Sequence, residues 1–235
     1  MQSRLITGLS ATHPNRNYCH SENVFKGMSI EVWKMRPEVT INVAQSLNGY
    51  ISGKGGKRIS ISNAEDAARV DTLRAESDAI LVGANTVILD NPTLRVRNLP
   101  AARQPIRVVL DSKFRIRPES SIFEDGHEVI IFTSRPGTNE FGKNVNIIRE
   151  DDLGIGNILA RLHEAGIRKL LVEGGSNVIS QFIETGLFDR FFVFIGNIIL
   201  PASSTPLFQG KAAGSLSFEF VSTLGDGILI KLFKH

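Results

Sequence analysis

The stretch KLLVEGGSNVISQFIETG, residues 169–186, contains an apolar run, one acid, two glycines and then a segment with helical spacing. The run 169–173 has the short, apolar character of a buried strand. The segment that follows predicts a helix ending at Gly186, with its apolar face formed by Val178, Ile179, Phe182 and Ile183. Glycine costs about 0.5–1 kcal/mol relative to alanine inside a regular element, so Gly174 and Gly175 indicate a tight turn or a close backbone approach to a ligand.

Strand-like and helix-like segments alternate outward from this stretch. The predicted strands are residues 39–44, 79–83, 106–111, 128–133, 145–148, 169–173 and 191–200. The predicted helices are residues 63–76, 156–166 and 177–186, with Asn63 as the N-cap of the first. The runs LSFEFV and ILIKLF, on either side of Asp226–Gly227, predict a closing antiparallel hairpin.

This order predicts an α/β fold, with a mostly parallel central sheet, helices on both faces and a C-terminal antiparallel hairpin. The chain has 235 residues, which suits one large domain over residues 36–235. Residues 1–35 are polar or weakly patterned, and we interpret them as an N-terminal extension. In open sheets of this class, ligands bind beyond the carboxyl ends of the strands.

Composition excludes several classes of protein. Hydrophobic residues make up 42% and charged residues 22% of the chain, so it is not a disordered protein. The formal net charge of +3 and the lack of a charge block give no reason to expect nucleic acid or a membrane as partner. The start has no signal-peptide run and no segment has the length of apolar residues that spans a bilayer, so we expect a cytoplasmic protein.

The single cysteine, Cys19, rules out an intrachain disulfide and any site built from several thiolates. His13 and His20 lie near it without a recognised metal-ligand spacing, so no metal is expected. Residues 46–60 contain a glycine-rich basic loop without the spacing of a Walker A motif, and no G-x-G-x-x-G follows the first strand. ATP hydrolysis is therefore not expected.

Polar residues follow the strand 79–83. After Gly83 we expect a short polar turn whose backbone N–H groups and Thr86 hydroxyl could hold an anion or a sugar. Asp90 comes four residues after Thr86, on the same side. The alternative is that Thr86 and Asp90 only close a loop around Asn91–Pro92, and the spacing does not decide between the two.

Two further groups suggest ligands. Arg95 and Arg97 alternate in an apparently extended stretch, so their guanidinium groups could face one phosphate, or simply face solvent. At the other strand end, the N–H groups that begin the helix at Ser176 or Asn177 favour an anion, which Glu173 would repel. We infer two ligands there, a phosphate-bearing one at the glycines and a donor-rich heterocycle or sugar at Glu173.

Five segments in order resemble the riboflavin-biosynthesis reductase family: VAQSLNGYIS, KRIS, LRAESDAILVGANTVILDNPTLRVR, PIRVVLDS and LLVEGGSNVISQFIETGLFDRFFVFI. The resemblance covers about residues 37–200 and implies a three-layer dihydrofolate-reductase-like fold. It also implies that the chain uses NADPH to reduce the ribosylamino side chain of a pyrimidine 5′-phosphate. Members of the family are generally homodimers, and the segment FDRFFVF would suit a buried edge between subunits.

The resemblance implies roles only where the motifs match. Positions matching the family's cofactor contacts are Ala44, Arg58, Gly83, Thr86, Asp90, Ser112, Gly174, Gly175, Ser176 and Asn177. Positions matching substrate contacts are Lys57, Arg74, Leu94, Arg97 and Glu173, and Glu173 is the candidate catalytic carboxylate. Ser134 and Arg135 are a hypothesis for the ribose 2′-phosphate of NADPH, although a turn at this point explains them equally well.

The chain departs from the family in two motifs. Asn48 stands where the family has a turn aspartate, and residues 200–210 read LPASSTPLFQG where a glycine pair is usual. The zinc-deaminase module often fused to bacterial members needs an H-x-E and a P-C-x-x-C, which one cysteine cannot supply. The chain therefore resembles stand-alone archaeal and fungal enzymes acting on the still-aminated 2,5-diamino pyrimidine. The alternatives are a reductase of the deaminated pyrimidine or of a pterin, and a non-catalytic nucleotide-binding module.

Overall fold

The computed structural model describes residues 35–99, 103–136, 140–211 and 215–233. The predicted N-terminal extension, with His13, Cys19 and His20, lies outside these ranges except for Met35.

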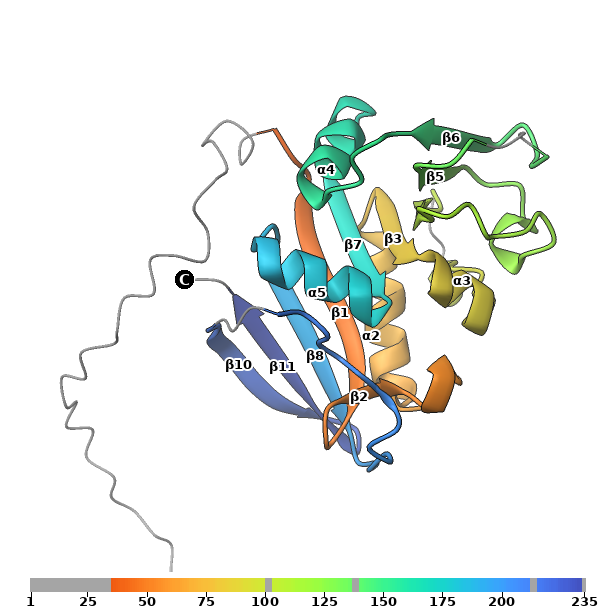
Figure 1. Ribbon diagram of the computed structural model, residues 1–235. Helices are drawn as coiled ribbons and strands as arrows, with labels where there is room; N and C mark the ends of the chain where they lie inside the picture. The colour runs from red at the N-terminus through yellow and green to blue at the C-terminus, as the bar shows by residue number, and fades with distance from the viewer. Residues whose placement is uncertain (1–34, 100–102, 137–139, 212–214, 234–235) are drawn as a thin grey trace, which may run out of the picture.

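A nine-stranded sheet organises the described residues, in the order β10-β11-β8-β1-β7-β3-β4-β5-β6 (Figure 1). Its strands are β1 Glu38–Ser46, β3 Ala79–Gly83, β4 Ile106–Leu110, β5 Val129–Thr133, β6 Val145–Arg149, β7 Lys169–Gly174, β8 Arg190–Gly196, β10 Ser217–Leu224 and β11 Gly227–Phe233. The seven strands from β8 to β6 are parallel to their neighbours, whereas β11 runs antiparallel to β8 and pairs with β10 as a hairpin. The predicted mostly parallel sheet and C-terminal hairpin are confirmed.

Helices cover both faces of this sheet. They are α2 Ala64–Ala75, α3 Ala84–Asp90, α4 Ile155–Glu164 and α5 Ser176–Thr185, with short 3₁₀ helices η1 Lys54–Gly56 and η2 Ser121–Phe123. Helices α4 and α5 lie side by side on one face, and α2 passes behind the sheet (Figure 1). Alternate residues of β3 enter two cores, Leu81 with α4 and α5 and Val82 with α3, which explains why this strand is apolar throughout.

Helix ends follow the sequence signals. The side chain of Asn63 accepts a hydrogen bond from Asp66 N at 2.9 Å and caps α2, as predicted. Gly186 ends α5 in the left-handed conformation, at φ +64°. Of the helices in the described ranges, none combines the length and apolarity needed to cross a bilayer.

Strand β8 is shorter than the predicted strand 191–200 and ends at Gly196. Asn48 explains the difference, since its Oδ1 accepts from Leu200 N at 3.0 Å and its Nδ2 donates to Leu200 O at 2.7 Å. An aspartate could not donate the second of these bonds. Residues 197–200 are thereby held against the turn after β1, and the following segment forms β9 Thr205–Pro206, which pairs with β2 Tyr50–Ser52.

Two other expectations are corrected. Residues 84–90 form helix α3 rather than a polar turn, because Ala84 and Val87 pack into the core at 2% and 1% exposure. The FDRFFVF segment is not an edge, because β8 lies between β1 and β11, and β10 is the edge strand on that side.

Candidate functional site

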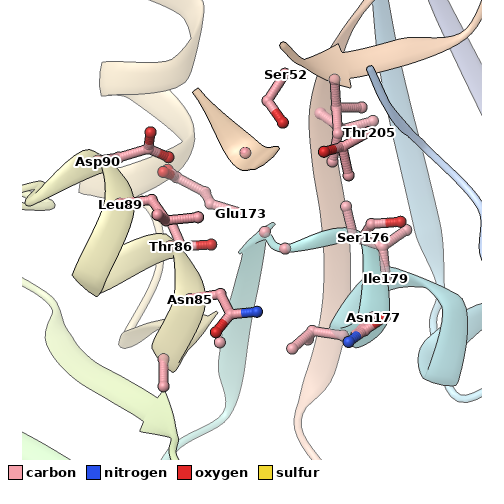
Figure 2. A pocket seen from close by; sticks show the side chains of 18 of the residues that line it. Ser52, Asn85, Thr86, Leu89, Asp90, Glu173, Ser176, Asn177, Ile179 and Thr205 are labelled. Carbon is pink, nitrogen blue, oxygen red and sulfur yellow. The ribbon is translucent and has the colours of Figure 1, made fainter. Parts of the chain in front are cut away.

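A cavity of about 700 Å³ opens beyond the carboxyl ends of β1, β3 and β7. Figure 2 shows Thr86 and Asp90 of α3 on one side of it, Ser176 and Asn177 of α5 on the other, and the end of β7 with Glu173 between them. Polar and small residues lining it include Asn42, Ala44, Ser52, Asp66, Gly83, Asn85, Thr86, Asp90, Ser112, Arg115, Glu173, Gly174, Gly175, Ser176, Asn177, Thr205 and Gln209. The cavity lies where an open parallel sheet binds its ligands.

The two strand ends singled out by sequence meet in this cavity. A Cβ atom built on Gly174 would lie 3.6 Å from Thr86 Oγ1, and one built on Gly175 would lie 3.3 Å from it. The register between β3 and β7 shifts by one residue before Val82, which pairs with Gly174. The missing side chains therefore leave room for a ligand beside the Thr86 hydroxyl.

Helix α5 begins directly at the glycine pair. Its first backbone hydrogen bond runs from Ile179 N to Gly175 O at 3.0 Å, so the preceding N–H groups are those of an open helix N-terminus, which favours an anion. The Ser176 hydroxyl, however, donates to Pro206 O at 2.7 Å and Leu207 O at 3.1 Å. Ser176 thus lines the cavity, while its hydroxyl fastens β9 to α5.

Glu173 is held by Arg74. Arg74 Nε and Nη2 donate to the two carboxylate oxygens of Glu173, each at 2.6 Å, and the side chains are only 15% and 10% exposed. Burial alone would lower the pKa of the Arg74 guanidinium, but the hydrogen bonds and charge of Glu173 raise it above its ordinary value. Arg74 therefore stays charged, and the two-point pairing fixes the Glu173 carboxylate at the cavity wall.

The segment after α3 is fastened to α2. Asp71 Oδ2 accepts hydrogen bonds from Asn98 N at 3.0 Å, Asn98 Nδ2 at 2.9 Å and Arg97 N at 3.3 Å. Leu94, in the same segment, is buried and has a left-handed backbone with φ +51°. Two residues of α2, Asp71 and Arg74, thus hold the backbone that carries Leu94 and Arg97, since Arg74 Nη1 also donates to Arg95 O at 3.0 Å.

Five predicted site residues do not line the cavity: Lys57, Arg58, Arg74, Leu94 and Arg97. Arg74 reaches it through Glu173, and Leu94 is packed in the core. Lys57, Arg58 and Arg97 are exposed. Arg95 and Arg97 are both exposed, with buried Val96 between them, and Arg95 Nε lies 3.7 Å from Asp125 Oδ2.

Asp90 lies opposite the glycine pair. Burial raises the pKa of its carboxyl, and the charge of Arg58 opposes that shift. Asp90 Oδ1 is buried and accepts no hydrogen bond from the described residues. A buried acceptor without a donor suits a ligand hydroxyl, as a ribose would supply.

Cations near Ser112 are the candidates for a second phosphate. Ser134 Oγ donates to Ser112 O at 3.0 Å, so the hypothesised Ser134 and Arg135 lie next to a residue of the cavity wall. Arg115 lines the cavity itself, 44% exposed and paired with Asp111 at 3.6 Å. Arg115 was not predicted, because it lies in the turn after β4, where an arginine four residues after Asp111 indicates only a local ion pair.

Sequence reasoning also missed Asn42 and Asp66, which are buried polar residues of the cavity wall at 6% and 2% exposure. Arg69 links them, with Nη2 2.6 Å from Asn42 Oδ1 and 2.7 Å from Asp66 Oδ1. The available signal was an asparagine inside the apolar strand 39–44, where a polar side chain needs a partner. Thr205 and Gln209 were missed because contacts distant in sequence bring them to the cavity: Thr205 belongs to β9, which pairs with β2, and Gln209 N donates to Ser180 Oγ at 2.8 Å.

Comparison with known proteins gives consistent matches. The RibD C-terminal domain family matches residues 37–230. The chain is 37% identical over 213 residues to the 2,5-diamino-6-ribosylamino-4(3H)-pyrimidinone 5′-phosphate reductase of Archaeoglobus fulgidus, covering 83% of this chain and 97% of that protein. It is 38% identical over 209 residues to the protein of the same name from Methanothermobacter thermautotrophicus, covering 84% of this chain and 92% of that one.

Among solved structures, the chain is similar to a diaminohydroxyphosphoribosylaminopyrimidine deaminase/5-amino-6-(5-phosphoribosylamino)uracil reductase from Thermotoga maritima. The TM-score is 0.77 at 29% identity, and the match covers 86% of this chain. It covers 58% of that longer chain.

Proposed function

The chain belongs to the RibD C-terminal domain family, and we propose that it reduces the ribosylamino side chain of 2,5-diamino-6-ribosylamino-4(3H)-pyrimidinone 5′-phosphate with NADPH. The observation that carries this proposal is the meeting of two strand ends in one cavity. The Thr86 hydroxyl faces the Gly174–Gly175 pair there. Glu173, the residue before this pair, also lines the cavity. The names of the two archaeal relatives support the choice of substrate.

The residues present fit NADPH. Gly174 and Gly175 carry no side chain where one would approach Thr86, so backbone and hydroxyl can contact a pyrophosphate closely. Asp90 Oδ1 offers an acceptor to a ribose hydroxyl. Ala44, Gly83, Ser112, Ser176 and Asn177 complete this side of the cavity. When bound, NADPH supplies the hydride, and the protein's task is to align it with the acceptor carbon.

Glu173 and its neighbours form the substrate side. The Glu173 carboxylate, which Arg74 holds in place, accepts hydrogen bonds from donors of the pyrimidine. Arg97, with Lys57 assisting, binds the 5′-phosphate; both side chains are exposed and neither lines the cavity. The ribose reacts as its open-chain imine, whose C1′ takes the hydride and whose nitrogen takes a proton, giving the ribitylamino product. No metal is required for these steps.

We further propose that the protein works in the cytoplasm as a homodimer, as the family resemblance implies. Light scattering of the purified chain measures the dimer directly.

Oxidation of NADPH by the purified chain tests the function. We expect oxidation that depends on the 2,5-diamino pyrimidine phosphate, with a lower kcat/KM for the deaminated pyrimidine and none for a pterin. Faster turnover of the deaminated compound would reassign the substrate. Cofactor binding without any turnover would identify a non-catalytic nucleotide-binding module.

A further inference from the structure

Arg69 connects two side chains that the mechanism above does not use. Its Nη2 donates to Asn42 Oδ1 at 2.6 Å and to Asp66 Oδ1 at 2.7 Å, and its Nε also donates to Asp66 Oδ1 at 3.0 Å. Asn42 belongs to β1 and Asp66 to the first turn of α2. Both residues are more than nine-tenths buried, and both line the cavity.

The hydrogen bonds of Arg69 decide which atoms are left for a ligand. A guanidinium can only donate, so the Asn42 amide must present its oxygen to Arg69 and keep Nδ2 for another partner. Asp66 Oδ1 is likewise taken by Arg69, which leaves Oδ2. Neither Asn42 Nδ2 nor Asp66 Oδ2 has a hydrogen-bond partner among the described residues. One donor and one acceptor are therefore available on two cavity-lining groups that share the same Arg69 nitrogen.

This pair is held in place before any ligand arrives. The Arg69 guanidinium lies over the Phe192 ring, 5.3 Å from its centroid, and its side chain is 17% exposed. Asn42 pairs with Phe192 in the register between β1 and β8, in the interior of the sheet. Because the partners sit on rigid elements, a ligand that matches them loses little binding free energy to ordering.

A donor beside an acceptor complements an amide edge, in which a carbonyl oxygen and an N–H group are neighbours. The 4(3H)-pyrimidinone ring carries this edge at its 4-oxo group and N3–H. Resting on the proposed function, we propose that Asn42 Nδ2 donates to the 4-oxo group and Asp66 Oδ2 accepts from N3–H. The pair thus binds the pyrimidine ring and sets its orientation in the cavity.

The carboxamide of the nicotinamide has a similar edge, and the charges around the pair favour the pyrimidine. Asp66 and Glu173 both line this cavity, and the pKa of Asp66 is raised by burial, lowered by Arg69 and raised further by the negative charge of Glu173. A wall with two carboxylates suits a ring with several donors. The diaminopyrimidinone offers N3–H and two amino groups, whereas the carboxamide offers a single NH₂ group.

Two substitutions test the pair, Asp66→Asn and Asn42→Ala. The first presents an amide NH₂ to N3–H, and the second removes the donor while keeping the ion pair between Asp66 and Arg69. We expect each to weaken binding of the pyrimidine phosphate by about 10- to 100-fold, measured by calorimetry without cofactor. The KM for NADPH stays within about two-fold of wild type, because the proposal gives the pair no contact with the cofactor. Loss of such a contact, at about 1.4 kcal/mol, would raise the KM about tenfold. Glu65→Gln, an exposed acid in the same helical turn, is the matched control and leaves both constants unchanged.

Three results separate the possibilities. Unchanged pyrimidine affinity in folded variants overturns the proposal, and a raised KM for NADPH alone reassigns the pair to the carboxamide. Should Asp66→Asn fail to fold, Asn42→Ala decides, because it keeps the ion pair. A wild-type protein without pyrimidine-dependent NADPH oxidation contradicts the proposed function instead, so the two failures are distinguishable.

Discussion

The hydroxyl oxygen of Thr86 lies 3.3 Å from the position that a Cβ atom on Gly175 would occupy. Thr86 follows β3 and Gly175 follows β7, two neighbouring strands that are about ninety residues apart in sequence. Their approach joins the two strand-end sites into one cavity, and the first prediction tests that junction.

Gly175→Ala is expected to raise the KM for NADPH at least about tenfold, which corresponds to about 1.4 kcal/mol of lost binding. The new methyl group would enter the space beside Thr86 Oγ1, and the backbone at φ +77° would be strained by about 1–3 kcal/mol. Steady-state kinetics with varied NADPH measures the effect.

Gly166→Ala is the control for backbone strain. Gly166 has φ +88°, and a Cβ built there meets no atom within 4 Å. The Gly166→Ala variant should lose stability through the same backbone strain as Gly175→Ala and keep the wild-type KM for NADPH. A Gly175→Ala enzyme with unchanged KM for NADPH would place the cofactor elsewhere.

Glu173→Gln is expected to lower stability by about 3–5 kcal/mol, because it leaves the largely buried Arg74 charge without its carboxylate. Urea unfolding measures the change, and kcat/KM for the pyrimidine should fall as well. Glu150→Gln removes one of the two carboxylates paired with Arg161, whose side chain is 51% exposed, and should leave the free energy of unfolding near its wild-type value. Equal effects in the two variants would contradict a structural role of the Glu173 pair.

Asp71→Ala is expected to raise the KM for the pyrimidine about tenfold while kcat and the KM for NADPH stay unchanged. Its carboxylate orders the backbone of Arg97 and Asn98, so the loss should weaken a contact that binds substrate and transition state equally. Asp78→Ala is matched to it, since Asp78 also accepts two backbone N–H bonds, from Arg168 and Lys169, each at 2.9 Å. A rise in pyrimidine KM of the same size in both variants would contradict this role.

Local signals were sufficient for much of this fold. The apolar runs predicted β3 and β7, and the glycine pair with its polar helix start predicted the turn before α5. Helix α3 was not predicted, because Asn85, Thr86, Val87 and Ile88 are weak helix formers and burial of Ala84 and Val87 decides its conformation. Tertiary packing overrode local propensity there.

The candidate site was predicted at its strand ends and missed where distant elements meet. Asn42, Asp66 and Arg69 come together only when α2 packs beside β1. Their spacing in the sequence does not predict that contact. Asn48 was interpreted as a turn residue, whereas its two bonds to Leu200 also set where β8 ends. Side-chain hydrogen bonds across about 150 residues of sequence lie beyond local patterns.

Asp66 predicts how stability depends on pH. Burial raises its pKa above the ordinary 3.8, with Glu173 adding to the shift and Arg69 opposing it. The folded state therefore binds this proton more tightly than the unfolded chain, and the resulting stability is present below pH 3.8 and lost as pH rises through the raised pKa. The stability of the Asp66→Asn variant relative to wild type should increase as pH rises through this window, measured by urea unfolding at successive pH values.

Asp125→Asn should show the opposite trend. Burial alone would raise the pKa of Asp125, but hydrogen bonds from Arg107 and the His127 backbone, with their charges, lower it below 3.8. Its stabilising contribution is present above that value and lost as pH falls, so the variant loses stability relative to wild type as pH rises. For Asp66→Asn, a difference in the free energy of unfolding from wild type that does not change with pH would show that burial does not disfavour the charge of Asp66.

The most direct test follows the hydride itself. The enzyme is supplied with NADPH carrying deuterium at C4 of the nicotinamide on the transferred face, together with the diaminopyrimidine phosphate, and the product is analysed by mass spectrometry and NMR. One deuterium at C1′ of the ribityl chain in each product molecule is the result expected when both ligands share the cavity between Thr86 and Glu173. Product without deuterium at C1′, or deuterium released to water, would contradict direct transfer in a single cavity.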